Sequence, residues 1–274
     1  MNSALKQWLK SIPYVERVWW AMRMIALTGP WQPLLLAVCR RYANNPRMAA
    51  PPTLLPALEP RRIAAQLDQE GWAEGFVLPA EQVHRILAFT AQSPQQTYEA
   101  PHRHCAAVWE IACDAQVLDV ARLYLQGEPI LYHSVIWRNQ GVANPESVRN
   151  FHLFRFHFDV ADVKSVVLFI YLSDVDEQSG PHMVISGTHY RKSLWHTVRL
   201  YLDEQTARAR YGDKVHQITG ARGTAFFEEQ TIYHKQLLPQ KPRLMLRITY
   251  TLWRVPGRSR ILQRLRRGRG APQR

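Results

Sequence analysis

The feature that most constrains the fold is a series of short apolar segments in the second half of the chain, separated by turn residues. The series begins with "PILYHSVIWRN" near residue 130 and ends with "RLMLRITYTLWR" near residue 254. The length of the segments and their β-branched and aromatic residues are typical of strands. Several such strands in succession predict an antiparallel sandwich or barrel.

Helical patterns precede these strands. The stretch "EPRRIAAQLDQEGWAEGFVLPAEQVHRILAFTAQ" predicts a helix that ends near Gly71, because glycine commonly follows the last turn of a helix. A short strand is expected from about Phe76 to Leu78, and a second helix after Pro79. We therefore expect a mainly β domain with flanking helices.

The positive charge of the chain lies at its two ends. The formal net charge is +13, yet residues 1–50 hold seven Lys or Arg residues against one acid, and residues 257–274 hold seven Arg and no acid, so residues 51–256 are neutral. Prolines around 51–62 indicate a linker. The predicted organisation is basic, apolar N-terminal helices (1–50), a Pro-rich linker (51–62), a main domain (63–256) and an Arg-rich tail (257–274).

The N-terminal segment "VWWAMRMIALTGPWQPLLLAV", residues 18–38, has about the length needed to cross a bilayer. Arg23 inside it and breaks at Gly29-Pro30 and Pro33 predict two short helices instead. These helices either cover the core or lie in a membrane interface. The arginine tail could contact anionic lipid or nucleic acid, or be a solvated end; we favour lipid and do not expect nucleic acid, because apolar helices and a basic end occur together.

The three cysteines, Cys39, Cys105 and Cys113, are an odd number without metal-ligand spacing, which favours a reducing compartment. The chain begins without the pattern of a secretion signal. We expect a cytoplasmic protein, with peripheral contact at the inner face of the membrane if the N-terminal helices bind lipid.

A His-x-Asp pair stands directly ahead of a strongly apolar strand, in "FRFHFDVADVKSVVLFIYL". Residues two apart on a strand point the same way, so Arg155, His157 and Asp159 would share one face. An imidazole and a carboxylate projecting together make up two of the three ligands of the 2-His-1-carboxylate triad that holds non-haem Fe(II). The third ligand must come from elsewhere, and His234, after a later strand and turn, is a candidate.

Two arginines follow His234 in the last strand. In "RLMLRITY", Arg243 and Arg247 share the face of Met245. A guanidinium inside a barrel is costly unless it pairs with an anion, and its planar fork fits a carboxylate such as the distal one of 2-oxoglutarate. The alternative is that one or both arginines form ordinary ion pairs.

Taken in order, these segments resemble the phytanoyl-CoA dioxygenase family of Fe(II)/2-oxoglutarate oxygenases. Members of that family look like an ordered pattern of "HxD", an apolar strand, an acidic turn with "NGP", a strand with "PGSH", and then a His and an Arg in a final strand pair. This chain has "HFD", "SVVLFIYL", "SDVDEQSGP", "HMVISGTH", "YH" and "PRLMLRITY". The match covers roughly residues 63–254. It departs at Gly223-Thr224, where the family has Gly-Asp, and at Ser186 and Thr188 in the "PGSH" motif.

The resemblance implies a double-stranded β-helix (jelly-roll, cupin-like) core and an oxygenase that uses Fe(II), 2-oxoglutarate and O₂. It implies that His157, Asp159 and His234 bind iron and that Arg243 binds the C5 carboxylate of 2-oxoglutarate. Arg155 shares the face of these ligands, so it is a candidate for the C1 carboxylate or for an acidic substrate, and the alternative is a structural ion pair. Related halogenases replace the carboxylate ligand with a small residue, so Asp159 favours oxygenation, and we expect hydroxylation of a small-molecule or lipid-linked substrate.

Two other classes of function remain open. The barrel could be a non-catalytic binding module whose basic ends contact membrane or nucleic acid, or a cupin-type metal enzyme without a co-substrate. The first would have no reason to keep all four site residues, and the second would not need Arg243. Among the other histidines, we expect His189 to support the ligands or the fold, and His152 to be exposed. His182, which follows Pro181 in a turn, could line the cavity mouth.

Overall fold

The computed structural model describes residues 22, 25–141, 154–189 and 201–253. His152, residues 257–274 and most of the first predicted N-terminal helix lie outside this part of the chain. The strands are β1 (Trp72–Val77), β2 (Thr97–Glu99), β3 (Ile130–Asn139), β4 (Ser165–Tyr171), β5 (His182–Ile185), β6 (Val215–Ile218), β7 (Thr224–Glu228), β8 (Tyr233–Gln236) and β9 (Arg243–Thr251). The helices are α3 (Gln32–Tyr42), α4 (Pro60–Glu70), α5 (Ala80–Gln92), α6 (Ala106–Ala112), α7 (Ala115–Leu125) and α9 (Glu204–Tyr211), with 3₁₀ turns at Pro101–Arg103 and Gly212–Lys214.

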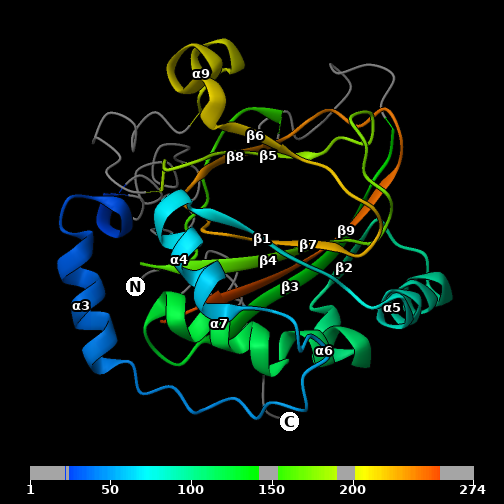
Figure 1. Ribbon diagram of the computed structural model, residues 1–274, viewed down its shortest axis with the longest axis horizontal. Coiled ribbons are helices and arrows are strands. Elements are labelled where there is room, and N and C mark those ends of the chain that lie inside the picture. The colour runs from blue at the N-terminus through cyan, green and yellow to red at the C-terminus, as the bar shows by residue number, and fades with distance from the viewer. Residues whose placement is uncertain (1–21, 23–24, 142–153, 190–200, 254–274) are drawn as a thin grey trace, which may run out of the picture.

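The strands form two sheets that face each other (Figure 1). The larger sheet has the order β1-β7-β4-β9-β3-β2, and the smaller has the order β6-β5-β8. All strand pairs are antiparallel. The predicted fold class, a mainly β jelly-roll with flanking helices, is confirmed.

The two faces of the larger sheet have different partners. Even-numbered residues of β9, such as Leu246 and Ile248, pack with α4 and α7 in the main hydrophobic core. Odd-numbered residues turn toward the smaller sheet, where Met245 joins a second cluster with Phe169 and Val184. Because side chains alternate along a strand, Arg243 and Arg247 also face the space between the sheets.

The junction between α4 and β1 partly follows the sequence prediction. α4 ends at Glu70 and Gly71 caps it with φ 79°, a left-handed conformation that favours glycine. β1 begins at Trp72, earlier than the predicted Phe76, because Trp72 already pairs with Glu228 of β7. The helix predicted after Pro79 begins at Ala80.

The segment that joins α3 to the main domain is anchored by polar contacts. Asp114, a fully buried residue that caps α7, accepts hydrogen bonds from the Thr53 hydroxyl (3.0 Å) and the Leu54 amide (2.6 Å). α4 starts at Pro60, so the end of the predicted linker 51–62 is helical.

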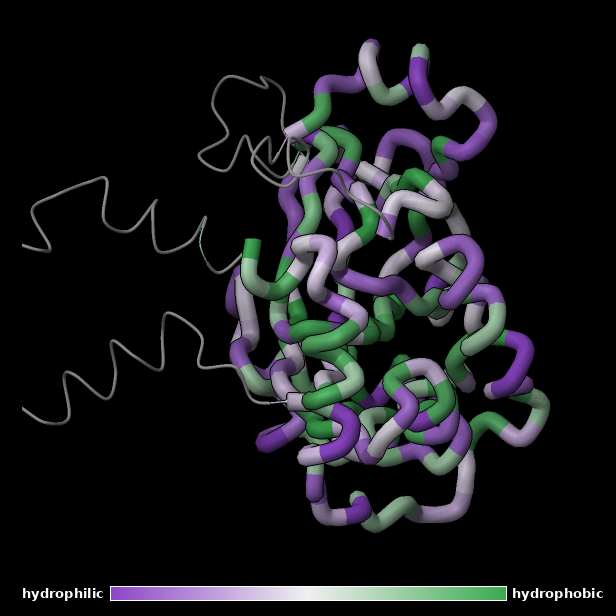
Figure 2. The backbone as a smooth tube through the Cα atoms, turned by 90° about the vertical axis from the view of Figure 1, so that its left-hand side faces the viewer, coloured by the Kyte–Doolittle hydropathy of each residue, from purple (hydrophilic) through white to green (hydrophobic). Residues whose placement is uncertain are grey.

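α3 itself has no buried residue. In the part of the chain that the structure describes, every helix is too short or too polar to cross a bilayer. Figure 2 shows hydrophilic residues prevailing at the α9 end, with most hydrophobic residues along the strands and the helices that cover them.

Candidate metal centre

The His-x-Asp segment does not form the regular strand that its alternation predicts. Phe156 and His157 make single bridges, to Leu202 and His234, and the chain then leaves the sheet. His157 exchanges two backbone hydrogen bonds with His234, of 2.9 and 2.8 Å. Pairing with β8 stops after His157 because the Asp159 amide donates to the carbonyl of Gln230 (2.8 Å), a residue that precedes β8.

This bridge brings the three predicted ligands together. The potential ligand atoms of His157, Asp159 and His234 all lie within 4.8 Å of one another. The Nε2 atom of His234 is 3.9 Å from Oδ2 of Asp159, and the two imidazole centroids are 4.6 Å apart. Among the described residues this is the one set of three His, Cys, Asp or Glu side chains with such geometry.

The imidazoles are oriented by backbone carbonyls. Nδ1 of His157 lies 2.8 Å from the Arg155 carbonyl, and Nδ1 of His234 lies 3.1 Å from the Ile232 carbonyl. A carbonyl accepts only, so each Nδ1 carries the proton and each Nε2 carries the lone pair. Burial lowers the pKa of His234 to about 4, which keeps the ring neutral as metal binding requires.

Arg243 is the largest of the fully buried side chains and has no carboxylate partner among the described residues. One Nη donates to the Gly180 carbonyl and the other to Oε1 of Gln236 (2.5 Å), whereas Nε has no hydrogen-bond partner. Burial lowers the pKa of Arg243 to about 10. A buried guanidinium with an unused donor is what a carboxylate ligand would complete.

Arg247 lies closer to the ligands. Its Nη1 is 4.0 Å from Oδ2 of Asp159, and its Nε is also buried without a hydrogen-bond partner. Arg243 is four residues away on the same strand face, roughly 13 Å along the backbone at about 3.3 Å per residue. The residues present therefore suit iron at the triad and a carboxylate at Arg243.

Arg155 is not brought to this group. Its side chain is exposed, and the guanidinium lies 5.4 Å from the centroid of the Tyr201 ring. Its contact with the C1 carboxylate stays a prediction.

His182 does not lie in the turn that its place after Pro181 predicts. It is the first residue of β5, is buried, and places Nε2 2.6 Å from Oε2 of Glu228, a residue that the motif does not single out. Strand alternation in "TAFFEE" does indicate which way Glu228 points, because it sets Glu228 on the face of Phe226 and opposite Phe227. Facing residues on β5 could not be assigned without the register of the smaller sheet.

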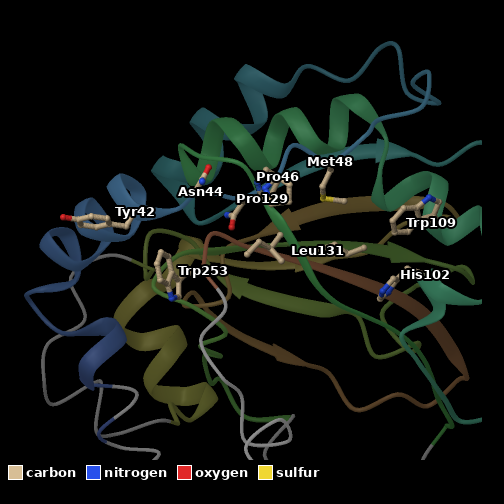
Figure 3. A pocket seen from close by; sticks show the side chains of 11 residues that line it. Tyr42, Asn44, Pro46, Met48, His102, Trp109, Pro129, Leu131 and Trp253 are labelled. Atoms are coloured by element: carbon tan, nitrogen blue, oxygen red, sulfur yellow. The ribbon is translucent and has the colours of Figure 1, made fainter. Parts of the chain in front are cut away.

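A separate cavity of about 710 Å³ lies away from the triad, beside β3. Tyr42 and Trp253 stand at one end of it and His102 and Trp109 at the other, with Leu131 between them (Figure 3). None of the predicted site residues lines it.

No family model and no curated protein matches the sequence. Solved structures do match the fold. AviO1 from Streptomyces viridochromogenes Tue57 has a TM-score of 0.51 at 13% identity, over 71% of this chain and 96% of that protein. The non-heme alpha ketoglutarate dependent epimerase SnoN from nogalamycin biosynthesis has a TM-score of 0.51 at 16% identity, over 70% and 82% of the two chains.

EctD from S. alaskensis, solved with 2-oxoglutarate and 5-hydroxyectoine, has a TM-score of 0.51 at 19% identity, over 76% of this chain and 81% of that protein. SnoN has also been solved with Fe³⁺, alpha ketoglutarate and nogalamycin RO. At these identities the likeness establishes the fold. The chain thus has the jelly-roll fold in which such iron- and 2-oxoglutarate-binding proteins are built.

Proposed function

We propose that this protein is a non-haem Fe(II)/2-oxoglutarate-dependent oxygenase of the phytanoyl-CoA dioxygenase family, and that it hydroxylates a C–H bond of a small-molecule or lipid-linked substrate. The observation that carries the proposal is the convergence of His157, Asp159 and His234 inside the same barrel as a buried arginine with an unused donor. The fold shared with SnoN and EctD supports it.

Each residue has a distinct task in this proposal. The two imidazoles, held by the carbonyls of Arg155 and Ile232, bind iron through Nε2, and the Asp159 carboxylate supplies the anionic ligand. The Arg243 guanidinium binds and orients the far carboxylate of the co-substrate. When bound, iron with 2-oxoglutarate and O₂ supplies an oxidant strong enough for C–H bonds, with release of succinate and CO₂.

Arg243 is preferred over Arg247 for the co-substrate because of its distance from the metal ligands. A guanidinium that lies 4.0 Å from a ligand carboxylate, as in Arg247, is too near the metal to meet the far end of a chelated 2-oxoglutarate. Arg243 begins the same strand and shares its inward face. Gln236, which bonds both Arg243 and Asn139, holds the guanidinium in place.

The test is the visible charge-transfer band that Fe(II) and 2-oxoglutarate produce together under anaerobic conditions. We expect the band in wild type, and a loss of 2-oxoglutarate affinity in Arg243→Met of about 30-fold, since removing one partner of a buried charge pair costs roughly 2 kcal/mol or more. Arg247→Met is the matched control, because it removes a guanidinium from the same strand face and should leave 2-oxoglutarate affinity close to that of wild type.

The outcomes separate the alternatives. Loss of affinity only in Arg247→Met would move the co-substrate site to Arg247. Iron binding without the band would favour a cupin-type enzyme without a co-substrate, and no iron binding would favour the non-catalytic binding module. Succinate formation that depends on substrate would identify the oxygenase, and mass analysis of the product would distinguish hydroxylation from epimerisation.

We further propose that α3 brings the protein to an anionic membrane, where a lipid-linked substrate is found. Trp31, Leu34, Val38 and Tyr42 are 43–71% exposed and recur at spacings that set them on one side of the helix. Arg41, in the last turn, is exposed, whereas Arg40 beside it donates to the Leu125 carbonyl. An exposed apolar stripe beside basic residues is typical of helices that lie in a lipid interface.

Sedimentation with vesicles tests this second proposal. We expect the protein to sediment with anionic vesicles at low salt and to be released as salt is raised, since screening weakens surface electrostatics. An absence of binding at low salt would rule the proposal out while leaving the oxygenase proposal intact.

A further inference from the structure

Glu228 is a carboxylate in the protein interior, where an unpaired charge lowers the stability of the fold. It ends β7 and is 1% exposed, on the strand face that also carries Phe226. A buried charge is tolerated only when it is paired, and replacing a buried ion pair by apolar residues of similar volume is often neutral or stabilising. Packing alone therefore does not explain an acid at this position.

The first partner of Glu228 is His182, which crosses from the smaller sheet. Its Nε2 lies 2.6 Å from Oε2 of Glu228. The His182 ring lies against Phe169 and Phe226, with centroids 4.9 and 5.4 Å away. Burial lowers the pKa of His182 well below its usual value, so this neighbour is a neutral imidazole.

The second partner is His234. Oε1 of Glu228 lies 3.1 Å from Nδ1 of His234, and this oxygen has no hydrogen bond of good geometry with any described residue. The opposite nitrogen of the same ring faces Asp159. The Ile232 carbonyl already accepts a hydrogen bond from Nδ1 of His234, so Glu228 adds a carboxylate on the protonated side of the ring. A carboxylate in this place supports the direction of a metal-binding imidazole and makes its other nitrogen a stronger donor.

We propose that Glu228, held by His182, is a positioning residue of the metal centre, which orients His234 and strengthens its bond to iron. This inference rests on the proposed function, because it requires His234 to bind iron. It adds two residues to the site, from β5 and β7, that the sequence motif does not contain.

The experiment compares two substitutions at Glu228 with one at its neighbour. Glu228→Gln keeps the shape and hydrogen-bonding capacity but removes the charge, and Glu228→Leu removes both. Glu229→Gln is the matched control, since Glu229 is 3% exposed and accepts a hydrogen bond from the Tyr124 hydroxyl (2.7 Å) on the other side of the strand. His182→Phe, which preserves the ring stack and removes the donor, is a further variant that tests the pair if Glu228→Leu does not fold.

Two quantities are measured anaerobically: Fe(II) affinity, by competition with a chromophoric chelator, and the wavelength of the Fe(II)–2-oxoglutarate band. We expect Fe(II) affinity to fall on the order of 10–100-fold in the Glu228 variants, and less in His182→Phe. We also expect the band to move to shorter wavelength, because a weaker imidazole donor lowers the energy of the metal electrons. Glu229→Gln should change neither quantity.

A structural role of Glu228 would lower thermal stability without moving the band. The inference is overturned if wild type shows the band and folded Glu228→Gln and His182→Phe retain its wavelength and the wild-type Fe(II) affinity. That result would leave the proposed function standing. Absence of iron binding in wild type would overturn the proposed function, and this inference with it.

Discussion

Asp159 is the anionic member of the triad, and its side chain is 46% exposed, far more than His234. Asp159→Asn keeps its shape and removes its charge, so we expect a folded protein whose Fe(II) affinity falls by at least about 100-fold, because losing a direct ligand should cost no less than losing a partner behind a ligand. Chelator competition measures the effect. Asp213→Asn, on an exposed turn, is the control, and equal affinities in the two variants would exclude Asp159 as a ligand.

The titration of Glu228 makes a prediction about stability in the metal-free protein. Burial raises the pKa of Glu228 from 4.5 to about 7. As pH rises from 4.5 to 7, the unfolded chain releases this proton while the folded protein retains it, so the folded state loses stability. Glu228→Gln cannot titrate at this position.

We therefore expect the free energy of unfolding of wild type, minus that of Glu228→Gln, to fall between pH 4.5 and 7 and to level off above. Urea unfolding at several pH values in the presence of a chelator measures it. A difference that stays constant across this range would mean that Glu228 ionises normally in the fold.

At the residue scale, the sequence allowed the three residues that converge to be predicted, but not the side chains behind them. His157, Asp159 and His234 stand in an ordered motif, and strand alternation orients Arg243 inward. His182 and Glu228 meet only because β5 and β7 belong to different sheets that face each other. Such a contact depends on the register of both sheets, which local patterns do not specify.

At the element scale, the turn between α4 and β1 links the helical layer to the segment that follows β7. Gly71 has φ 79°, and its carbonyl accepts a hydrogen bond from the Glu229 amide (2.8 Å). A Cβ atom at this position would lie 2.5 Å from Nδ1 of His189. Gly187 has a similar φ of 74°, yet nothing lies within 4 Å of a Cβ there.

Alanine substitutions at the two glycines separate the cost of a left-handed backbone from the cost of a close contact at Cβ. Gly187→Ala should cost about 1 kcal/mol of unfolding free energy, from the left-handed conformation alone. Gly71→Ala should cost about 1 kcal/mol more, because His189 must also move. Urea unfolding of both variants measures the difference, and equal losses would show that His189 yields without cost.

The elements themselves could largely be predicted, because a buried strand such as β4 is an uninterrupted apolar run between turns. The predicted limits of strands were wrong where the available pairing partners, and not the local composition, set the limits. β1 starts early because β7 offers partners from Trp72 onward. The His-x-Asp segment is reduced to bridges because, after His157, the Asp159 amide bonds the Gln230 carbonyl, which lies outside β8. Alternation indicates which side chains share a face, but not how long a ladder continues.

At the scale of the whole molecule, hydrophobic residues are exposed unevenly. Half of the large hydrophobic side chains exposed in the described residues lie between Met22 and Tyr42, although this region is a small part of the chain. α3 contacts the barrel side through polar groups, such as Arg40 to the Leu125 carbonyl (3.2 Å) and Gln32 to the Val163 carbonyl (2.9 Å). The proposal that α3 contacts lipid rests on this arrangement.

The exposed hydrophobic side chains of α3 should matter for vesicle binding and not for folding. Leu34→Ser with Val38→Ser should change the free energy of unfolding by no more than about 0.5 kcal/mol, as is usual for surface positions. The double variant should bind anionic vesicles more weakly, because less apolar area enters the interface. Val77→Ser with Leu123→Ser is the control, since these residues are exposed to similar degrees outside α3. If both double variants sediment like wild type, then basic residues alone hold the protein to the vesicles and α3 does not insert; if both lose binding equally, the contact is non-specific.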